Sequence, residues 1–255
     1  LDAYTFNVIG VQNILTLSRR FKKLEYFHHV SSYSAAGPIS GKVLEDEVAD
    51  IDEYTDHYAR SKMQGEQIFR SMDIGKVKKR IYRPGITIGS TDDGLIEKID
   101  GPYYLLKFVY ENQDKLQFIN KLGFFPFPFE KDSTLPVISV NVLAQWLAIS
   151  ILRPNPTEDI RAYHFMGKKN ILLEDFIGEA LKLYGINVPL MGLKNNPAFK
   201  YILPKIGMPK ELINYMYLES KFDVTNRVAD FPGHVEVDIE KMTKLLAVGC
   251  NKYFM

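Results

Sequence analysis

A tyrosine and a lysine stand four residues apart in the segment Y-A-R-S-K, as Tyr58 and Lys62. On a helix, residues at this spacing lie on one face, so both side chains would point the same way. A phenol with a pKa of about 10 is a poor acid–base group at neutral pH. A lysine ammonium held nearby favours the phenolate and lowers that pKa. The pair therefore predicts a group suited to proton transfer.

A serine supplies a third polar group. Ser32 ends the segment H-V-S-S, after an apolar run from Tyr26 that is typical of a buried parallel strand. Its hydroxyl could hold the substrate oxygen that the tyrosine protonates, while a cofactor moves a hydride. Ser31 would face the other way and bond the backbone. Adjacent His28 and His29 would point to opposite faces, which favours packed or hydrogen-bonded roles and predicts no metal site.

The spacing alone is not diagnostic, because Tyr-x-x-x-Lys occurs three more times, at Tyr103/Lys107, Tyr201/Lys205 and Tyr217/Lys221. Only the Tyr58 pair has the elements that would position it. A strand over 26–32 precedes it, followed by a polar, acidic segment over 38–56 that we expect to be a solvated loop. The helix would run from Tyr58 to about Met72. A second strand over 77–83 would follow and end at Pro84-Gly85.

Four motifs in this frame resemble the extended short-chain dehydrogenase/reductase family. They are N-V-x-G at Asn7–Gly10, H-V-S-S at His29–Ser32 with Gly37 after it, Y-x-x-x-K at Tyr58–Lys62, and Y-R-P-G-I at Tyr82–Ile86. Their order and spacing are those of the family, from residue 1 to about residue 90. Beyond that point the resemblance rests on weaker features.

The resemblance implies a role for each matching residue. Tyr58 would give or take the proton, and Lys62 would lower its pKa and bond the nicotinamide ribose. Ser32 would orient the substrate oxygen. Asn7 would help to arrange a proton-relay water; its other interpretation is a place in a helix that packs its glycine close to a strand. The main chain of Pro84, Gly85 and Ile86 would hold the nicotinamide carboxamide, and the cofactor would be NADP or NAD.

Within the family, the likeness is greatest to thioester reductases and fatty acyl-CoA reductases. It rests on H-H-V-S-S, on Y-A-R-S-K followed by Glu66, on Y-R-P-G-I-T-I-G, and on the segment F-F-P-F-P-F within 122–129. This branch implies reduction of a hydrophobic acyl thioester, bound to CoA or to a carrier protein. The segment 122–129 would form a substrate wall or plain core. Alternatives are a nucleotide-sugar epimerase or dehydratase, a sterol-type dehydrogenase, and a non-catalytic member that binds a ligand or partner.

The fold class expected is α/β, a Rossmann-type doubly wound parallel sheet with a smaller, mostly helical cap. Residues 1–90 and 135–168 would belong to the dinucleotide-binding domain, and 91–134 and 169–255 to the substrate-binding cap. Substrate would lie between the sheet and the cap, outside the carboxyl ends of the strands. The Gly-rich turn that normally holds the pyrophosphate is not in this sequence, so we expect a fragment or the ordered part of a longer chain.

Composition narrows the class of partner. The 255 residues carry 32 Lys+Arg and 31 Asp+Glu, a net charge of +1 that gives no reason to expect nucleic acid or an anionic membrane as partner. Basic clusters at Arg19–Lys23 and Lys76–Arg80 should be solvated. The single cysteine, Cys250, excludes an intrachain disulfide and fits a reducing compartment. No apolar run is long enough to span a bilayer, and no signal-peptide pattern opens the chain. We expect a cytoplasmic protein that can form a homodimer.

Overall fold

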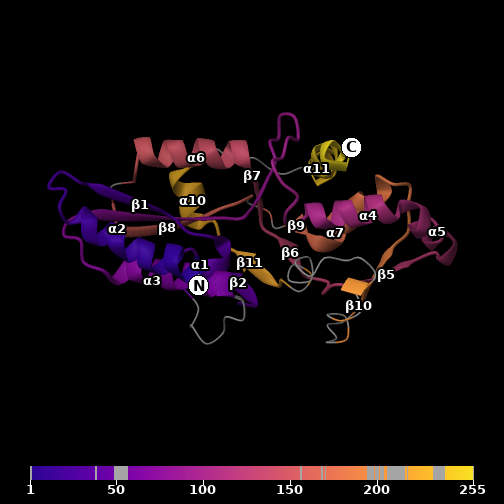
Figure 1. Ribbon diagram of the computed structural model, residues 1–255, viewed down its shortest axis with the longest axis horizontal. Coiled ribbons are helices and arrows are strands. Elements are labelled where there is room, and N and C mark those ends of the chain that lie inside the picture. Colours follow the sequence, from indigo (N-terminus) through magenta and orange to yellow (C-terminus); the bar gives the residue numbers. More distant parts are fainter. Residues whose placement is uncertain are drawn as a thin grey trace. The chain divides into compact units, whose positions relative to one another are not determined.

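The computed structural model describes residues 2–37, 39–48, 57–155, 157–167, 169, 171–193, 198, 201, 204–205, 216, 218–231 and 239–254. For residues 252–254 it describes the backbone only. The chain divides into two compact units (Figure 1). The first unit comprises Leu1–Gly85, Val142–Lys168 and Ser220–His234. The second unit comprises Ile86–Asn141, Lys169–Glu219 and Val235–Met255.

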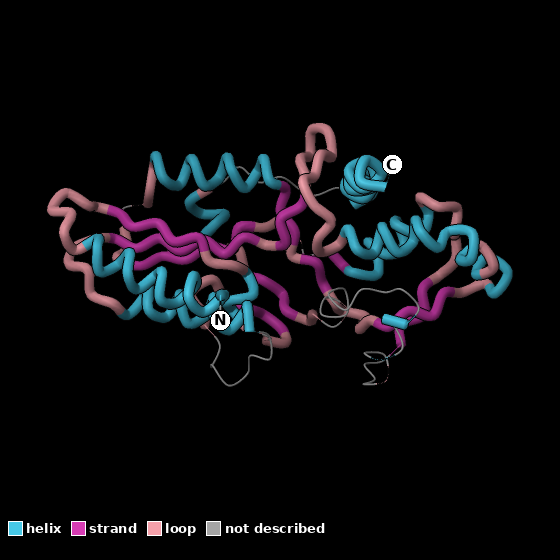
Figure 2. Tube along the Cα trace, viewed as in Figure 1, coloured by secondary structure: helices cyan, strands magenta, loops and turns pink. Residues whose placement is uncertain are grey.

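A parallel sheet forms the centre of the first unit. Its strands are β1 (Tyr26–Val30), β3 (Lys78–Pro84) and β8 (Ile160–Phe165), in the order β1-β3-β8. Figures 1 and 2 show helices on both faces, α2 (Gly10–Ser18) and α3 (His57–Ser71) on one and α6 (Val140–Leu152) and α10 (Thr225–Asp230) on the other. This layering confirms the α/β fold class with a doubly wound parallel sheet.

Alternation along the strands explains the two layers, since successive side chains point to opposite faces. Toward α2 and α3, Ile81 and Ala162 pack against Leu15 and Phe69. On the other face, the ring of Tyr82 contacts those of Tyr163 and Phe165. Phe165 also contacts Trp146 of α6, and both Tyr163 and Phe165 contact Phe231 after α10. Both faces of the sheet are therefore closed by apolar packing.

The predicted parallel strand over 26–32 is confirmed as β1. Among the described residues only β3 pairs with it, and its side chains are half-buried up to Val30, which is 48% exposed. The two histidines are nevertheless packed, as predicted. His28 Nδ1 lies 2.8 Å from the Tyr82 hydroxyl, and the His29 ring stacks on Phe69 at 4.8 Å.

The first helical segment is interrupted by a π-helical turn. It runs as α1 (Asp2–Tyr4), the π-helix η1 (Thr5–Ile9) and α2, where the sequence predicts one helix over 3–20. A glycine allows this segment to lie close to α3. That glycine is Gly65 of α3, and not Gly10 of the segment itself. A Cβ on Gly65 would lie 2.0 Å from the Asn7 carbonyl oxygen, whereas one on Gly10 would have its nearest neighbour at 3.6 Å. Gly65 is thus the residue that the close approach requires.

The basic cluster Lys76–Arg80 is not fully solvated, contrary to expectation. Lys79 and Arg80 are 6% and 0% exposed. Lys79 Nζ donates to the carbonyls of Arg70 and Met72 at the end of α3, at 2.9 and 2.7 Å. The negative end of the helix dipole also stabilises a cation at this place. Because helices cover both faces of the sheet, a charged side chain within β3 cannot reach solvent, and its burial is costly unless carbonyl or carboxylate groups bond it.

Two short strands complete the first unit and were not predicted. β2 (Gly41–Val43) pairs in parallel with β11 (Ser220–Phe222), which places part of the supposed solvated loop and part of the supposed cap in one sheet. The 3-10 helix η2 (Tyr33–Ala36) precedes β2. Of the predicted acidic loop over 38–56, Pro38 and 49–56 lie outside the described residues.

The second unit is built of four helices and three strand pairs within its described residues. The helices are α4 (Tyr103–Leu116), α5 (Ile119–Leu122), α7 (Leu173–Lys182) and α11 (Ile239–Phe254). The pairs are β4 (Ile86–Ile88) with β7 (Val137–Ser139), β5 (Phe125–Pro128) with β10 (Leu190–Leu193), and β6 (Thr134–Leu135) with β9 (Ile171–Leu172), the last antiparallel. No helix in the described ranges is long and apolar enough to cross a membrane.

The apolar segment 122–129 divides between core and surface. Phe127 and Phe129 are 2% and 3% exposed in the core of the second unit, while Leu122 and Phe124 are 51% and 42% exposed. Core packing therefore accounts for the inner phenylalanines, and only the outer part is open to another role. Much of the aromatic stretch over 197–217, including Phe199, Tyr215 and Tyr217, lies outside the described residues.

The boundaries of the two units differ from the predicted domains. Residues 86–90 and 135–141 group with the second unit because β4 pairs with β7, and 220–234 groups with the first because β11 pairs with β2. These pairings join segments far apart in the sequence, which periodicity cannot reveal. The assignment of cofactor binding to one unit and substrate binding to the other stays a prediction.

Candidate functional site

The predicted acid–base pair lies in the first two turns of α3. Tyr58 is 48% exposed, and Lys62 Nζ lies 6.0 Å from the centre of its ring. Burial of the lysine lowers its pKa from 10.5. The two groups thus share one face of the helix, as their spacing predicts. The separation is that of a loose cation–π contact, at the outer limit of such interactions.

Ser32 follows β1 and begins η2. Its backbone is extended, with φ −154° and ψ 153°. Its Oγ accepts a hydrogen bond from the Ser34 N–H at 3.3 Å and lies 2.9 Å from the Ser34 Oγ. Ser32 is therefore the N-cap of a single 3-10 turn, which fixes the side chain at the carboxyl end of the sheet.

Asn7 lies in the π-helical turn and contacts the same helix as the tyrosine. Its Nδ2 donates to the Ser61 Oγ at 2.9 Å, and Ser61 donates to the Tyr58 carbonyl at 2.8 Å. Together with the close approach at Gly65, these bonds tie η1 to the first turns of α3. A π-helical turn is a frequent feature of functional sites.

The main chain at the end of β3 is already bonded within the protein. The Gly85 N–H donates to the Phe165 carbonyl at 3.0 Å, and the Ile86 N–H donates to the Pro136 carbonyl at 2.6 Å. Pro84 has no N–H. These three residues therefore have no N–H that they could donate to a ligand without breaking a bond in the chain.

A buried cluster of charges, which the sequence did not predict, lies directly behind these residues. Glu66 and Arg83 are both 0% exposed and form a two-point pair, Nε to Oε2 at 3.0 Å and Nη2 to Oε1 at 2.6 Å. Ser31 Oγ donates to the same carboxylate at 2.9 Å, as does Arg70 Nε. The prediction that Ser31 bonds the backbone with its hydroxyl is wrong, because a buried carboxylate faces it from α3.

The cluster sets the charge state of its members. Burial alone would raise the pKa of Glu66, but the charge and hydrogen bond of Arg83, then Arg70 and Ser31, lower it from 4.5 to about 2. His164, whose Nε2 lies 3.3 Å from Arg83 Nη1, has its pKa lowered to about 3 by burial and by that guanidinium. Glu66 is thus ionised and His164 neutral at neutral pH.

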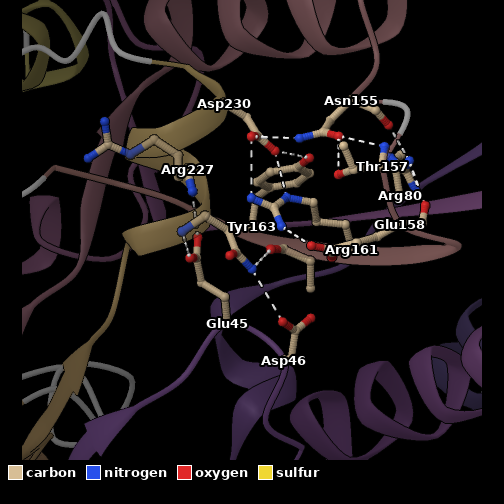
Figure 3. Close-up of polar contacts among 12 residues, drawn as sticks. Glu45, Asp46, Arg80, Asn155, Thr157, Glu158, Arg161, Tyr163, Arg227 and Asp230 are labelled. Carbon is tan, nitrogen blue, oxygen red and sulfur yellow. Dashed lines mark hydrogen bonds and ion pairs between the residues drawn. The ribbon is translucent and has the colours of Figure 1, made fainter.

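A second buried carboxylate joins the loop after β2 to β8 and α10. Glu45 is 2% exposed and accepts the backbone N–H of Arg227 at 3.2 Å (Figure 3). It also accepts the backbone N–H groups of His164, at 2.9 Å, and of Asn226. Burial raises its pKa from 4.5 to about 7, although the three N–H groups act against that rise. The expectation that this acidic stretch is solvated is therefore wrong for Glu45.

Figure 3 also shows an ion cluster toward the amino ends of the strands. Asp230 accepts from Arg161 Nε at 2.6 Å, from the Tyr163 hydroxyl at 2.7 Å and from Asn155 Nδ2 at 2.7 Å. Arg161 and Tyr163 point to the face of the sheet opposite α3. The predicted site residues lie at the other end of the strands, so this cluster is structural.

The other three Tyr-x-x-x-Lys pairs lack this setting. Tyr103 is 3% exposed, and its hydroxyl accepts the Gly89 N–H at 2.7 Å. Tyr201 is 76% exposed, and Tyr217 lies outside the described residues. Among the described side chains, no group of three His, Cys, Asp or Glu residues is placed to hold a metal ion. Glu66 and Arg83 were visible in the sequence only as charges next to motif residues, without a signal of their pairing.

Comparison with known proteins gives a family and a set of similar folds. The profile of the NAD-binding family described as male sterility protein matches residues 2–143. The terminal R domain of the myxalamid PKS-NRPS biosynthetic pathway is similar, with a TM-score of 0.69 and 18% identity over 98% of this chain and 63% of that one. A search of curated proteins gave no significant match.

Two further solved structures show the same fold. The UDP-glucuronic acid 4-epimerase of Bacillus cereus, in complex with UDP-glucuronic acid and NAD, has a TM-score of 0.64 and 16% identity, over 98% of this chain and 68% of that one. RMD of Pseudomonas aeruginosa, complexed with NADPH, has a TM-score of 0.61 and 11% identity, over 98% and 74%. At such identities the likeness concerns the fold alone.

Proposed function

The chain belongs to the male sterility protein family of NAD-binding domains, and on that premise we propose that it reduces a hydrophobic acyl thioester or a related carbonyl. NAD(P) is the cofactor class of this family and of the extended short-chain dehydrogenases/reductases around it. The observation that carries the proposal is Tyr58 with Lys62 on one face of α3, tied through Ser61 to Asn7.

The proposed roles follow from the contacts. Tyr58 gives its phenolic proton to the substrate oxygen as the carbon accepts a hydride, and Ser32 holds that oxygen. The Lys62 ammonium stabilises the resulting phenolate by its charge. Asn7 supports proton supply at the start of α3. The cofactor, when bound, supplies the hydride.

The donors and acceptors present fit a nicotinamide nucleotide. Lys62, half-buried beside Tyr58, can donate to a ribose hydroxyl. The N–H groups of Gly85 and Ile86 are bonded within the chain and Pro84 has none, so a carboxamide held by this main chain would have to donate to a carbonyl oxygen. The first unit is accordingly the cofactor-binding part and the second unit the part that selects the substrate.

An apolar substrate is favoured by the second unit, where several large apolar side chains are exposed: Leu95, Phe118, Leu122, Phe124 and Met191. An acyl chain on CoA or a carrier protein would suit such a surface. The similar R domain is the terminal domain of a PKS-NRPS biosynthetic pathway. Nucleic acid is not the partner we propose, given a net charge of +1, and we propose a cytoplasmic homodimer.

A nucleotide-sugar epimerase or dehydratase is the second candidate, favoured by the fold similarity to the Bacillus cereus epimerase. Sterol-type dehydrogenases of this fold would share the same catalytic groups. A non-catalytic ligand-binding member would not need Ser32, Tyr58 and Lys62 together.

A substrate panel on the full-length protein separates these candidates. We expect consumption of reduced nicotinamide, followed by absorbance, with a long-chain acyl-CoA and not with a UDP-sugar or a sterol. A Lys62→Met variant should lose this activity, whereas Lys107→Met, which changes the lysine of another Tyr-x-x-x-Lys pair, should keep it. Turnover of a UDP-sugar instead would shift the function to the epimerase candidate. Failure to bind either NADPH or NADH would refute the oxidoreductase.

A further inference from the structure

We propose that Glu66, through Ser31 and Arg83, is the positioning residue that sets the distances among the three catalytic segments. The inference rests on the proposed function and adds to it residues that touch neither substrate nor cofactor.

Each member of the cluster is close in the chain to a different site segment. Ser31 precedes Ser32, and Arg83 precedes Pro84. Glu66 follows Lys62 by four residues, one helical turn farther along α3. A single carboxylate therefore binds the end of β1, the end of β3 and the helix that carries the acid–base pair. Displacing it would change the spacing of all three.

The geometry of the cluster leaves little freedom. The Glu66–Arg83 pair is held at two points, at 3.0 and 2.6 Å, and both residues are fully buried. Planar two-point pairs of this kind fix orientation as well as distance. Ser31 is 5% exposed, and its backbone N–H donates to the Tyr82 carbonyl at 2.7 Å, which extends the β1–β3 register beyond the strand. The backbone bond thus aligns Ser31 with β3, and the hydroxyl of Ser31 joins this aligned segment to Glu66.

Stability alone is a weak reason for such a cluster. An apolar group of the same volume would often serve a fold as well as a buried ion pair, because taking charges out of water is costly. What an ion pair adds is a defined geometry. The backbone pairing of β1, β3 and β8 already sets the sheet, and Ala35 after β1 packs on Ala59 and Met63 of α3. Glu66 adds to this apolar packing hydrogen bonds of defined direction from the ends of β1 and β3 to the helix of Tyr58.

The test uses Ser31→Ala, which removes one hydroxyl and leaves the ion pair in place. We expect kcat to fall about tenfold, since sub-ångström displacements of reacting groups carry large rate costs. The KM for the acyl substrate should be unchanged. The upper limb of the pH–rate profile should move to higher pH as Lys62 loses its hold near Tyr58. Ser31→Thr, which keeps a hydroxyl in an extended backbone, should recover most of the rate.

The matched control is Asp230→Asn in the cluster of Figure 3, which ties a helix to a strand but lies toward the amino ends of the strands. It should lower the melting temperature and leave kcat and the pH profile unchanged. Equal kcat for wild type and Ser31→Ala would overturn the inference. So would a loss of kcat in Ser31→Ala that Ser31→Thr does not recover, or that Asp230→Asn reproduces.

A failure of the proposed function would look different. The wild-type protein would then bind reduced nicotinamide but turn over none of the substrates. In that case the positioning of Lys62 would be measured by the affinity for NADPH, because Lys62 is proposed to bond the ribose of the cofactor. Ser31→Ala should weaken NADPH binding a few-fold and Asp230→Asn should not. Equal NADPH affinity in all three proteins would overturn the inference without reference to turnover.

Discussion

Replacing Glu66 by glutamine should destabilise the first unit strongly. The carboxylate accepts from Arg83, Arg70 and Ser31, all at 3.0 Å or less. A glutamine keeps one oxygen but turns an NH2 group toward donors at the position of the other. It also leaves Arg83, 0% exposed, with an uncompensated charge.

Two independent routes give a similar magnitude. The difference between 4.5 and about 2 in the pKa of Glu66 corresponds to roughly 3 kcal/mol of folding free energy in favour of the ionised carboxyl. Removing one partner of a buried ion pair costs about 3–5 kcal/mol in other proteins. We therefore expect Glu66→Gln to lose about 3 kcal/mol at neutral pH.

The protein has one tryptophan, Trp146, which packs on Phe165 at 5.5 Å in the first unit. Its fluorescence in a urea titration reports the unfolding of the unit that contains Glu66. The measurement is repeated from pH 6 down to pH 2.5. Because the folded pKa is lowered, the stabilisation is complete above about 4.5 and is lost as the pH falls toward about 2.

The free energy of unfolding of Glu66→Gln should lack this acid-dependent decrease. The stabilities of the wild type and of Glu66→Gln should therefore converge as the pH falls. A loss below about 1 kcal/mol at neutral pH, or an unchanged slope between the two pKa values, would refute the assignment of an ionised, buried Glu66. Asp230→Asn serves as the comparison, since it breaks a less buried pair in the same unit.

Two further predictions concern the same unit. Gly65→Ala places a Cβ 2.0 Å from the Asn7 carbonyl oxygen and should cost more than about 2 kcal/mol and lower activity, whereas Gly10→Ala, with its nearest neighbour at 3.6 Å, should stabilise by about 0.5–1 kcal/mol in urea titrations. Glu45, whose pKa is raised to about 7, adds stability below about 4.5 that is lost as the pH rises through 7. Between pH 6 and 8 the wild type should lose about 1 kcal/mol that Glu45→Gln does not; a parallel pH dependence would contradict it.

Local pattern was enough to predict much of the fold. The apolar run from Tyr26 and the strand ended by Pro84-Gly85 predicted β1 and β3, and the helix expected from Tyr58 to about Met72 predicted α3 within a few residues. These elements carry their signal in consecutive side chains. The pairing of β2 with β11 joins residues about 180 positions apart through two three-residue strands, and no periodicity in such short segments predicts it.

The candidate residues could be named from the sequence, whereas the buried charges behind them could not. Tyr58 and Lys62 follow from a spacing on one helix, and Ser32 from a strand end. The partner of the Ser31 hydroxyl does not follow from the sequence, because Glu66 reaches it from α3 and is itself held by Arg83 from β3, and only the folded chain brings the three together. Charged residues in a strand, such as Arg83, indicate a buried partner without identifying it.

The central claim is that Tyr58 is the proton donor of a nicotinamide-dependent reduction. It is tested most directly by rapid mixing of the full-length protein, saturated with NADPH, with a long-chain acyl-CoA, comparing wild type with Tyr58→Phe. We predict equal NADPH affinity in both proteins, rapid loss of reduced-nicotinamide absorbance in the wild type, and a rate at least 100-fold lower in the variant, in line with the usual worth of a general acid. Equal rates in the two proteins would contradict the account.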